Sequence, residues 1–158
     1  MKIAVAADTH GRIEALKKQL IKDKPEHLFF AGDFLSDSRR LAHHLGIKSD
    51  AVLGNCDGRT TGDGEKVIEL AGKRFYIVHG HQFGVKGSLN PLFYRGQELG
   101  VDAVIFGHTH VACCEQVAGM WMLNPGSASR PRRGKMASYI MLHIEGPDME
   151  PSLQYFIP

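Results

Sequence analysis

The sequence lacks the features of an exported or membrane-bound protein. Of its 158 residues only three are cysteines, and two of them, Cys113 and Cys114, are adjacent, which excludes a disulfide framework. No apolar run approaches the roughly 20 residues of a membrane span, and the opening "MKIAVAAD" ends in an acid without a cleavage site. We therefore expect one domain over residues 1–158, cytoplasmic, with no membrane partner.

The chain also lacks a strong charge of either sign. Its net charge is +2, too small by itself to indicate a nucleic-acid or membrane surface, so nucleic acid is an unlikely substrate. Hydrophobic residues make up 43% and charged residues 23%, as in ordinary globular proteins. No internal repeat, low-complexity segment or linker divides the sequence.

Buried strands and amphipathic helices alternate in the first third of the chain. Apolar runs predict strands over 2–8, 26–33 and 50–55, and helical spacing predicts helices over 12–23 and 38–46. The second part is richer in strands, with a hairpin at Ala71–Gly72, a helix over 91–99 and a strand over 101–107. Three more strands are expected within 111–124, 136–146 and 152–158, with turns at Gly119 and Gly146–Pro147. This pattern predicts an α/β fold of two stacked, mostly mixed sheets flanked by helices.

Polar side chains follow the end of five of these strands, nearly always beside a glycine. They are Asp8 and His10, Asp33, Asn55, His79 and His81, and His108 and His110. Ligand sites of α/β sheets lie outside the carboxyl ends of the strands. A single histidine there is usually structural, but five such ends in one chain are hard to explain by packing, because ionisable groups are seldom buried unpaired.

The residue types indicate a metal site. Imidazole together with carboxylate suits Zn, Mn, Fe, Co or Ni. Side chains two residues apart on an extended segment share a side, so Asp8 with His10, and His108 with His110, can each reach one site. The whole set exceeds the needs of one ion, whereas two ions about 3.5–4 Å apart and bridged by a carboxylate would use it fully.

In this order the residues resemble the calcineurin-like metallophosphoesterase family, with its pattern D-x-H, G-D, G-N-(H/C)-(D/E), H and G-H-x-H. The resemblance extends from Met1 to about Ser129, and "GNCD" (54–57) and "NPGS" (124–127) resemble its small phosphodiesterase branch from bacteria and archaea. It implies a four-layer αββα sandwich. It also implies one metal held by Asp8, His10, Asp33 and His110, and a second held by Asp33, Asn55, His79 and His108.

The resemblance further implies a phosphodiesterase that hydrolyses small phosphate diesters through a hydroxide bridging two divalent ions. Mn²⁺ is the first candidate for the ions, with Ni²⁺, Co²⁺, Zn²⁺ and Fe²⁺ as alternatives. A phosphomonoesterase or nuclease of the same family is one alternative function. Another is a silent scaffold resembling the retromer subunit of this fold, although a scaffold has no need of a complete ligand set.

Asn55, His81 and Arg130 are the candidates for catalysis and substrate binding. Asn55 can ligate through its carbonyl oxygen while its amide group points at a phosphate oxygen. His81 either orients substrate or fixes the position of a metal ligand, and we favour the latter. Asp57 is expected to hydrogen bond near His10 or the Asn55 loop. Arg130 begins a basic segment, with Arg132, Arg133 and Lys135, that is either a solvated loop, a phosphate-attracting rim or a contact with a second subunit.

Cys56 is the unusual member of "GNCD". Many relatives have a histidine at this position, thought to protonate the leaving group, and a thiol is a poor substitute near pH 7. We therefore expect catalysis to depend on a good leaving group, on a metal-bound water or on another proton donor such as His81. The adjacent cysteines at 113–114 are expected in a strand with one thiol in the core, and "NPLFY" (90–94) and the strand-rich tail could form a homodimer interface.

Overall fold

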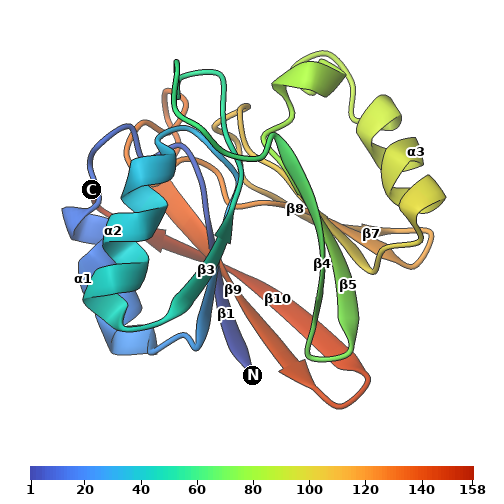
Figure 1. Ribbon diagram of the computed structural model, residues 1–158, viewed down its shortest axis with the longest axis horizontal. Coiled ribbons are helices and arrows are strands. Elements are labelled where there is room, and N and C mark those ends of the chain that lie inside the picture. Colours follow the sequence, from blue (N-terminus) through green and yellow to red (C-terminus); the bar gives the residue numbers. More distant parts are fainter.

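Two five-stranded sheets stack face to face with helices on both outer sides (Figure 1). The computed structural model covers residues 1–158. The first sheet has the order β10 (Asp148–Phe156), β9 (Ala137–Glu145), β1 (Lys2–Ala6), β2 (His27–Phe30) and β3 (Lys48–Ala51). The second has the order β4 (Glu65–Leu70), β5 (Lys73–Val78), β6 (Ala103–Ile105), β8 (Met120–Asn124) and β7 (Cys113–Val117). The two-sheet prediction is confirmed.

Helices close the outer faces of this sandwich. α1 (Glu14–Asp23) and α2 (Leu35–Leu45) cover the first sheet, and α3 (Asn90–Leu99) covers the second, preceded by the short 3₁₀ helix η1 (His81–Phe83) (Figure 1). β1, β2 and β3 are parallel, as are β5, β6 and β8, while the strands outside these triplets pair antiparallel. Each sheet therefore directs several strand ends to the same edge.

Three apolar clusters separate the four layers. Between the sheets, the rings of Phe29 and Phe75 lie 4.9 Å apart within a fully buried cluster of mostly β-branched and leucine side chains. Leu16 and Leu20 of α1 pack on the outer face of the first sheet, and Leu92 of α3 packs on the second. Each such side chain contributes about 1.5–3 kcal/mol on burial, so the hydrophobic periodicity of the sequence accounts for the layering.

Several element boundaries differ from the sequence prediction, and two of the changes, in α2 and β3, lie next to loops that carry predicted metal ligands. α2 begins at Leu35 rather than residue 38, because the carboxylate of Asp57 accepts the N–H of Leu35, which has no partner within the helix, at 2.6 Å and so supports an earlier first turn. β3 spans Lys48–Ala51 rather than 50–55. The chain leaves the sheet after Ala51 and carries Gly54 against Asp33.

The tail also contains one more strand than predicted. Residues 111–124 form two strands, β7 and β8, joined by a tight turn at Ala118–Gly119 where both residues have positive φ. β10 begins at Asp148, ahead of the predicted residue 152. Pro151 is tolerated inside it because β10 is an edge strand, where a missing N–H costs no ladder hydrogen bond.

The cysteines agree with the predicted absence of disulfides, since all three are free. The prediction for the adjacent pair was wrong in detail, because both thiols are half-buried on β7. Cys114 packs against the cluster between the sheets and Cys113 against the cluster below α3. No helix is both long and apolar enough to cross a bilayer.

Candidate metal centre

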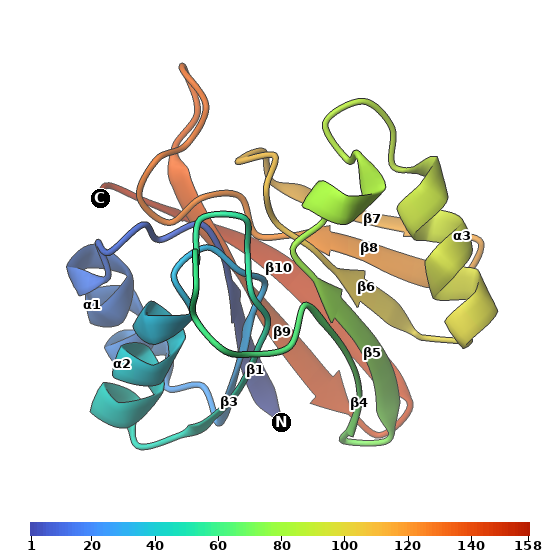
Figure 2. The ribbon, with the colours of Figure 1, turned by 45° about the horizontal axis from the view of Figure 1, so that its top comes forward.

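The polar strand ends converge at one edge of the sandwich. Figure 2 shows the loops after β1, β2 and β5 approaching one another at the upper edge, opposite the β4–β5 turn. The parallel pairing of β1 with β2, and of β5 with β6, places these ends side by side within each sheet. Stacking of the two sheets then brings the two sets together, which no local sequence feature specifies.

Four of the expected ligands form a tight first cluster. The ligating atoms of Asp8, His10, Asp33 and His110 all lie within 4.8 Å of one another. Nε2 of His10 is 3.4 Å from Nε2 of His110, which in turn is 3.3 Å from Oδ1 of Asp8. Two nitrogens bound tetrahedrally at the usual 2.0–2.1 Å would be separated by about 3.3 Å, so this spacing fits ligands of one ion.

The remaining expected ligands gather on the other side of Asp33. Nε2 of His79 lies 3.0 Å from Oδ1 of Asn55 and 3.4 Å from Oδ1 of Asp33, and the His108 ring is 5.1 Å from the His79 ring. The other oxygen of Asp33, Oδ2, faces His10 at 3.8 Å. One carboxylate therefore faces both groups, which is the arrangement that a bridging ligand requires.

Asp8 gives the strongest physical indication that a cation belongs here. Its Oδ1 is buried and accepts no hydrogen bond, whereas Oδ2 accepts the backbone N–H of His108 at 3.1 Å. A buried carboxylate oxygen without a partner is costly and requires an explanation such as an ion. The oxygen points among imidazole nitrogens that are themselves metal ligands by type, so the donor set fits a divalent metal.

Backbone carbonyls orient two of the histidines. Nδ1 of His79 donates to the carbonyl of Ala31, and Nδ1 of His110 donates to the carbonyl of Arg130, each at 2.7 Å. Since a carbonyl can only accept, the proton lies on Nδ1 in both rings. The lone pair of Nε2 then points into the candidate centre. In metal sites, a hydrogen bond to the other ring nitrogen commonly fixes the tautomer of a histidine ligand in this way.

Ionisation states in the centre also suit metal binding. Burial, followed by the nearby His79, lowers the pKa of His108 to about 4, and burial lowers the pKa of His10. Burial acts to raise the pKa of Asp33, but the N–H of Cys56 and the charge of His79 hold it below its ordinary value. The pKa of His110, in contrast, is raised by Asp8, so a metal ion would have to displace a proton from this ring. Neutral imidazoles and an ionised carboxylate are the forms that bind metal.

Unusual backbone conformations hold the ligands. Five ligand residues have φ between 47° and 67°, a region that residues with side chains seldom adopt, and these are Asp8, His10, Asp33, His108 and His110. Each costs of order 1–3 kcal/mol and persists only where the surroundings enforce it. The strain is concentrated in the loops that carry the predicted metal ligands, and sequence analysis did not predict it.

The neighbouring glycines have a packing role. A Cβ atom on Gly54 would lie 2.1 Å from Oδ1 and 2.3 Å from the backbone nitrogen of Asp33. A Cβ on Gly32, whose φ is +87°, would lie 2.6 Å from Nδ1 of His79. Glycine recurs beside the ligands because the loops approach one another more closely than any side chain permits.

The other candidate residues occupy the rim. His81 is exposed, with its ring 5.5 Å from that of His79 and 6.0 Å from that of His108, and no hydrogen bond ties it to either. Arg130 is also exposed and carries the carbonyl that holds His110. Asp57 accepts the N–H of Gly54 at 2.7 Å and so shapes the Asn55 loop.

Cys56 contributes its backbone rather than its sulfur to the centre. Its N–H donates to Oδ1 of Asp33 at 2.9 Å, while the residue itself is exposed. Partial desolvation, and then the hydrogen bond with Asp33, raises the pKa of the Cys56 thiol to about 11. The thiol is therefore protonated at neutral pH and is not an activated nucleophile.

Several supporting residues were not identified from the sequence. The hydroxyl of Ser127 donates to the carbonyl of Asp8 at 2.7 Å, and Asn124 donates to the carbonyl of Gly107 at 3.0 Å. Both belong to the "NPGS" motif, from which the sequence analysis inferred a family resemblance but no role for either residue. Asp37 accepts hydrogen bonds from Thr9 and Gly11, each at 2.7 Å. Its position at the start of a helix gave no indication of this contact.

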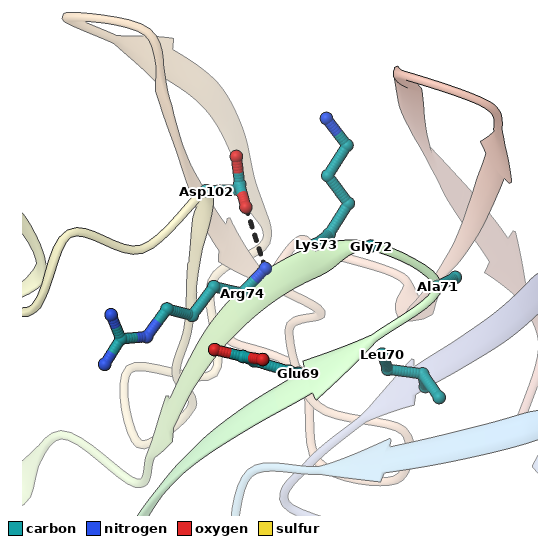
Figure 3. A pocket seen from close by; sticks show the side chains of 7 residues that line it. All are labelled: Glu69, Leu70, Ala71, Gly72, Lys73, Arg74 and Asp102. Carbon is teal, nitrogen blue, oxygen red and sulfur yellow. Dashed lines mark hydrogen bonds between the residues drawn. The ribbon is translucent and has the colours of Figure 1, made fainter.

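A separate cavity of about 340 Å³ lies at the other end of the second sheet (Figure 3). It is lined by the β4–β5 turn and Asp102, whose carboxylate accepts the N–H of Arg74 at 2.7 Å. Arg74 lies near the start of β5, and the ligand His79 follows the end of that strand. The cavity is therefore remote from the metal centre and contains none of the candidate site residues.

Comparisons with known proteins agree with this geometry. Residues 1–147 match the model of the calcineurin-like phosphoesterase superfamily domain. A probable metallophosphoesterase of Bacillus subtilis is 34% identical over 146 residues, which cover 92% of this chain and 85% of the relative. The phosphodiesterase YfcE of Escherichia coli is 30% identical, with coverage of 90% and 87%.

Among solved structures, the fold is similar to that of Vps29 from Entamoeba histolytica complexed with Zn²⁺. The TM-score is 0.81 at 21% identity, and the match covers 99% of this chain and 98% of that one. At this identity the match supports the fold alone. The family match over residues 1–147 and the sequence identity to the two bacterial relatives establish that the chain belongs to the calcineurin-like phosphoesterase superfamily.

Proposed function

We propose that the protein is a phosphodiesterase that hydrolyses small phosphate diesters with two divalent cations, Mn²⁺ being the first candidate. The observation that carries the proposal is the buried, unpartnered Oδ1 of Asp8 among imidazole nitrogens. Family membership supports phosphoester hydrolysis, and the name of the E. coli relative supports a diester. The Zn²⁺ complex of Vps29 supports metal binding by this fold.

The two ligand groups would each hold one cation, with Asp33 shared between them. The first group is Asp8, His10, Asp33 and His110, and the second is Asp33, Asn55, His79 and His108. When bound, the two cations would supply a hydroxide nucleophile near neutral pH and positive charge for the phosphoryl oxygens. The carbonyls that hold Nδ1 of His79 and His110 would keep both rings ready to bind.

Residues at the rim would act on the substrate. Asn55 is exposed, so its amide group could donate to a phosphate oxygen while Oδ1 serves as a ligand. Arg130 would add a charged contact to the phosphate. The exposed ring of His81 lies near the rings of His79 and His108 without a hydrogen bond of its own, and we assign it to protonation of the leaving group.

A scaffold role is the alternative of a different class, and the shared fold with Vps29 is the finding that favours it. Against it stand the strained ligand backbone and the unpartnered carboxylate oxygen, which a scaffold has no reason to retain. A phosphomonoesterase or nuclease would use the same centre. Activity towards a panel of diesters, monoesters and nucleic acids separates these alternatives.

The test combines turnover with metal analysis. Purified protein should hydrolyse bis(4-nitrophenyl) phosphate when supplied with Mn²⁺, Ni²⁺ or Co²⁺, and should bind two ions per chain. Asp33→Asn weakens the proposed bridge, so we expect turnover to fall by at least about 100-fold and the metal content to drop. Failure with every metal and every ester would exclude the enzyme, and full activity of Asp33→Asn would exclude the shared carboxylate.

A further inference from the structure

A cation-rich loop lies beside the candidate metal centre, and none of its cations forms an ion pair with an acidic residue of the chain. We name residues 130–135 the basic loop, and its cations are Arg130, Arg132, Arg133 and Lys135. The sequence contains no acidic residue between Glu115 and Glu145. None of the ion pairs in the structure involves the basic loop. Its positive charge is therefore available to a ligand.

The basic loop is bonded to the loops that carry the metal ligands. The carbonyl of Arg130 accepts Nδ1–H of His110 at 2.7 Å, and Nε of Arg132 donates to the carbonyl of Thr109 at 3.0 Å. On the preceding segment, the hydroxyls of Ser127 and Ser129 both donate to the carbonyl of Asp8. These contacts hold the start of the basic loop in a fixed position beside the candidate metal centre. A loop that only connected two strands through solvent would not need them.

The basic loop also lies on the open side of the first ligand cluster. The side chain of His110 is 22% exposed, compared with 8% for His10 and none for Asp8, so the cluster opens towards His110. Figure 2 shows the segment around residue 130 projecting beyond that edge of the sheets. Arg132 uses only Nε in its bond to Thr109, so its two terminal amino groups remain free for a ligand.

We propose that the basic loop binds a second phosphate group of the substrate, so that the preferred substrate is a small phosphodiester that carries a further phosphate. The inference rests on the proposed function and specifies its substrate class. A guanidinium group matches the geometry of a phosphate and can bond it twice. A diester with uncharged arms would occupy the metal centre and leave these cations unused.

Two substrates that differ by a single phosphate test the proposal. They are thymidine 5′-(4-nitrophenyl phosphate) and its 3′-phosphorylated derivative, which share the scissile bond and the leaving group. Exposed charge pairs each change affinity by up to about fivefold, so two cations acting together should lower KM for the 3′-phosphorylated ester about tenfold. The advantage should shrink in high salt because exposed charges are screened.

Variants test whether the basic loop causes the lower KM of the 3′-phosphorylated ester. The double change Arg133→Ala/Lys135→Ala retains Arg132 and its bond to Thr109, so we expect the KM advantage of the 3′-phosphorylated ester to fall severalfold, with Arg132 supplying what remains. Lys48→Ala is the matched control, because Lys48 is an exposed, unpaired cation at the start of β3, away from the metal end. The control should retain the full ratio.

A binding experiment keeps the proposal testable even if no ester is hydrolysed. Calorimetry on chelator-treated protein should show tighter binding of thymidine 3′,5′-bisphosphate than of thymidine 5′-phosphate, and the double variant should lose most of the difference. Equal affinities, or an equal loss in Lys48→Ala, would overturn the proposal. Affinity that keeps rising with the length of an oligothymidylate would also overturn it, in favour of nucleic acid.

Discussion

At the scale of single residues, close contacts hold the predicted metal ligands. Asp33 illustrates this, because its Oδ1 faces Nε2 of His79 and accepts the N–H of Cys56, while its Oδ2 faces His10. The backbone at Asp33 has a φ of 58°, and Gly54 packs directly against it. Position 33 therefore requires both a carboxylate side chain and a backbone with positive φ.

Gly54→Ala should disrupt the centre although it removes no ligand. The added Cβ would meet the backbone nitrogen of Asp33 at 2.3 Å, so no rotamer change can relieve the clash. We expect a loss of about 1–3 kcal/mol in the free energy of unfolding and weaker metal binding in calorimetry. Gly64→Ala is the control, since Gly64 is exposed and its nearest neighbour would be 3.7 Å away. Normal metal affinity in Gly54→Ala would contradict this account.

Cys56→His tests how far His81, the proposed proton donor, makes up for the histidine that is absent at position 56. An imidazole on this exposed position could protonate a poor leaving group, which the neutral thiol cannot do effectively. We expect the rate to rise by about 100-fold for alkyl esters and to change little for 4-nitrophenyl esters, as measured by kcat over a leaving-group series. An unchanged dependence on the leaving group would reject the idea, and His81→Ala should steepen the dependence if His81 is the existing donor.

At the scale of elements, side-chain hydrogen bonds join helices and strands that are distant in sequence. Tyr139 of β9 donates to the carboxylate of Asp23 at the end of α1, and Tyr76 of β5 donates to Glu65 of the neighbouring strand β4. The first contact links residues 116 positions apart and fixes α1 on the first sheet. Such hydrogen bonds fix the relative position of elements whose packing is otherwise mainly apolar.

The contact with Asp23 should make stability depend on alkaline pH. Burial, followed by the bond to Asp23, raises the pKa of Tyr139 above its ordinary value of 10.0. A raised pKa means that the stabilisation is complete below pH 10 and is lost as the pH rises further. Tyr139→Phe should cost about 1 kcal/mol at pH 7, and the difference from wild type should shrink above pH 10 in urea unfolding.

A control variant separates this effect from the other ionisations. Tyr155 is 56% exposed and makes no hydrogen bond through its hydroxyl, so Tyr155→Phe should leave the stability profile unchanged. A difference between Tyr139→Phe and wild type that stays constant across the alkaline range would show that the hydroxyl of Tyr139 ionises normally.

At the scale of the whole molecule, the candidate metal centre lies where loops of both sheets meet. Asp8, His10, Asp33 and Asn55 follow strands of the first sheet, whereas His79, His108 and His110 follow strands of the second. Ions held by both groups would connect the two halves of the sandwich. Metal occupancy should therefore affect the stability of the entire fold.

Removal of metal should lower the melting temperature. At an ion concentration 100 times the dissociation constant, binding to the native state contributes about 2.7 kcal/mol. For a chain of this size that corresponds to a shift of about 5–10 °C. Calorimetry before and after chelation, with Mn²⁺ added back, measures the shift. A melting temperature that does not change on chelation or reconstitution would argue against a centre shared between the sheets.

Local patterns were sufficient for much of the fold. Apolar runs predicted β1, β2 and β6, and the Ala71–Gly72 turn predicted the β4–β5 hairpin, because burial and turn chemistry act over a few residues. The early start of α2 was missed because it depends on Asp57, which is 22 residues from Leu35. The β7–β8 turn was recognised at Gly119, but its two arms were counted as one strand.

The sequence by itself determined which residue types the candidate site contains and that they follow strands, since both depend only on local order. Tertiary structure decided which ligands meet. His10 and His110 are 100 residues apart, yet their Nε2 atoms lie 3.4 Å apart. The two oxygens of Asp33 face different ligand groups, and the basic loop borders the open side of the first group. These relations follow from strand pairing and the stacking of two sheets, which place distant segments side by side and have no signature in any one segment.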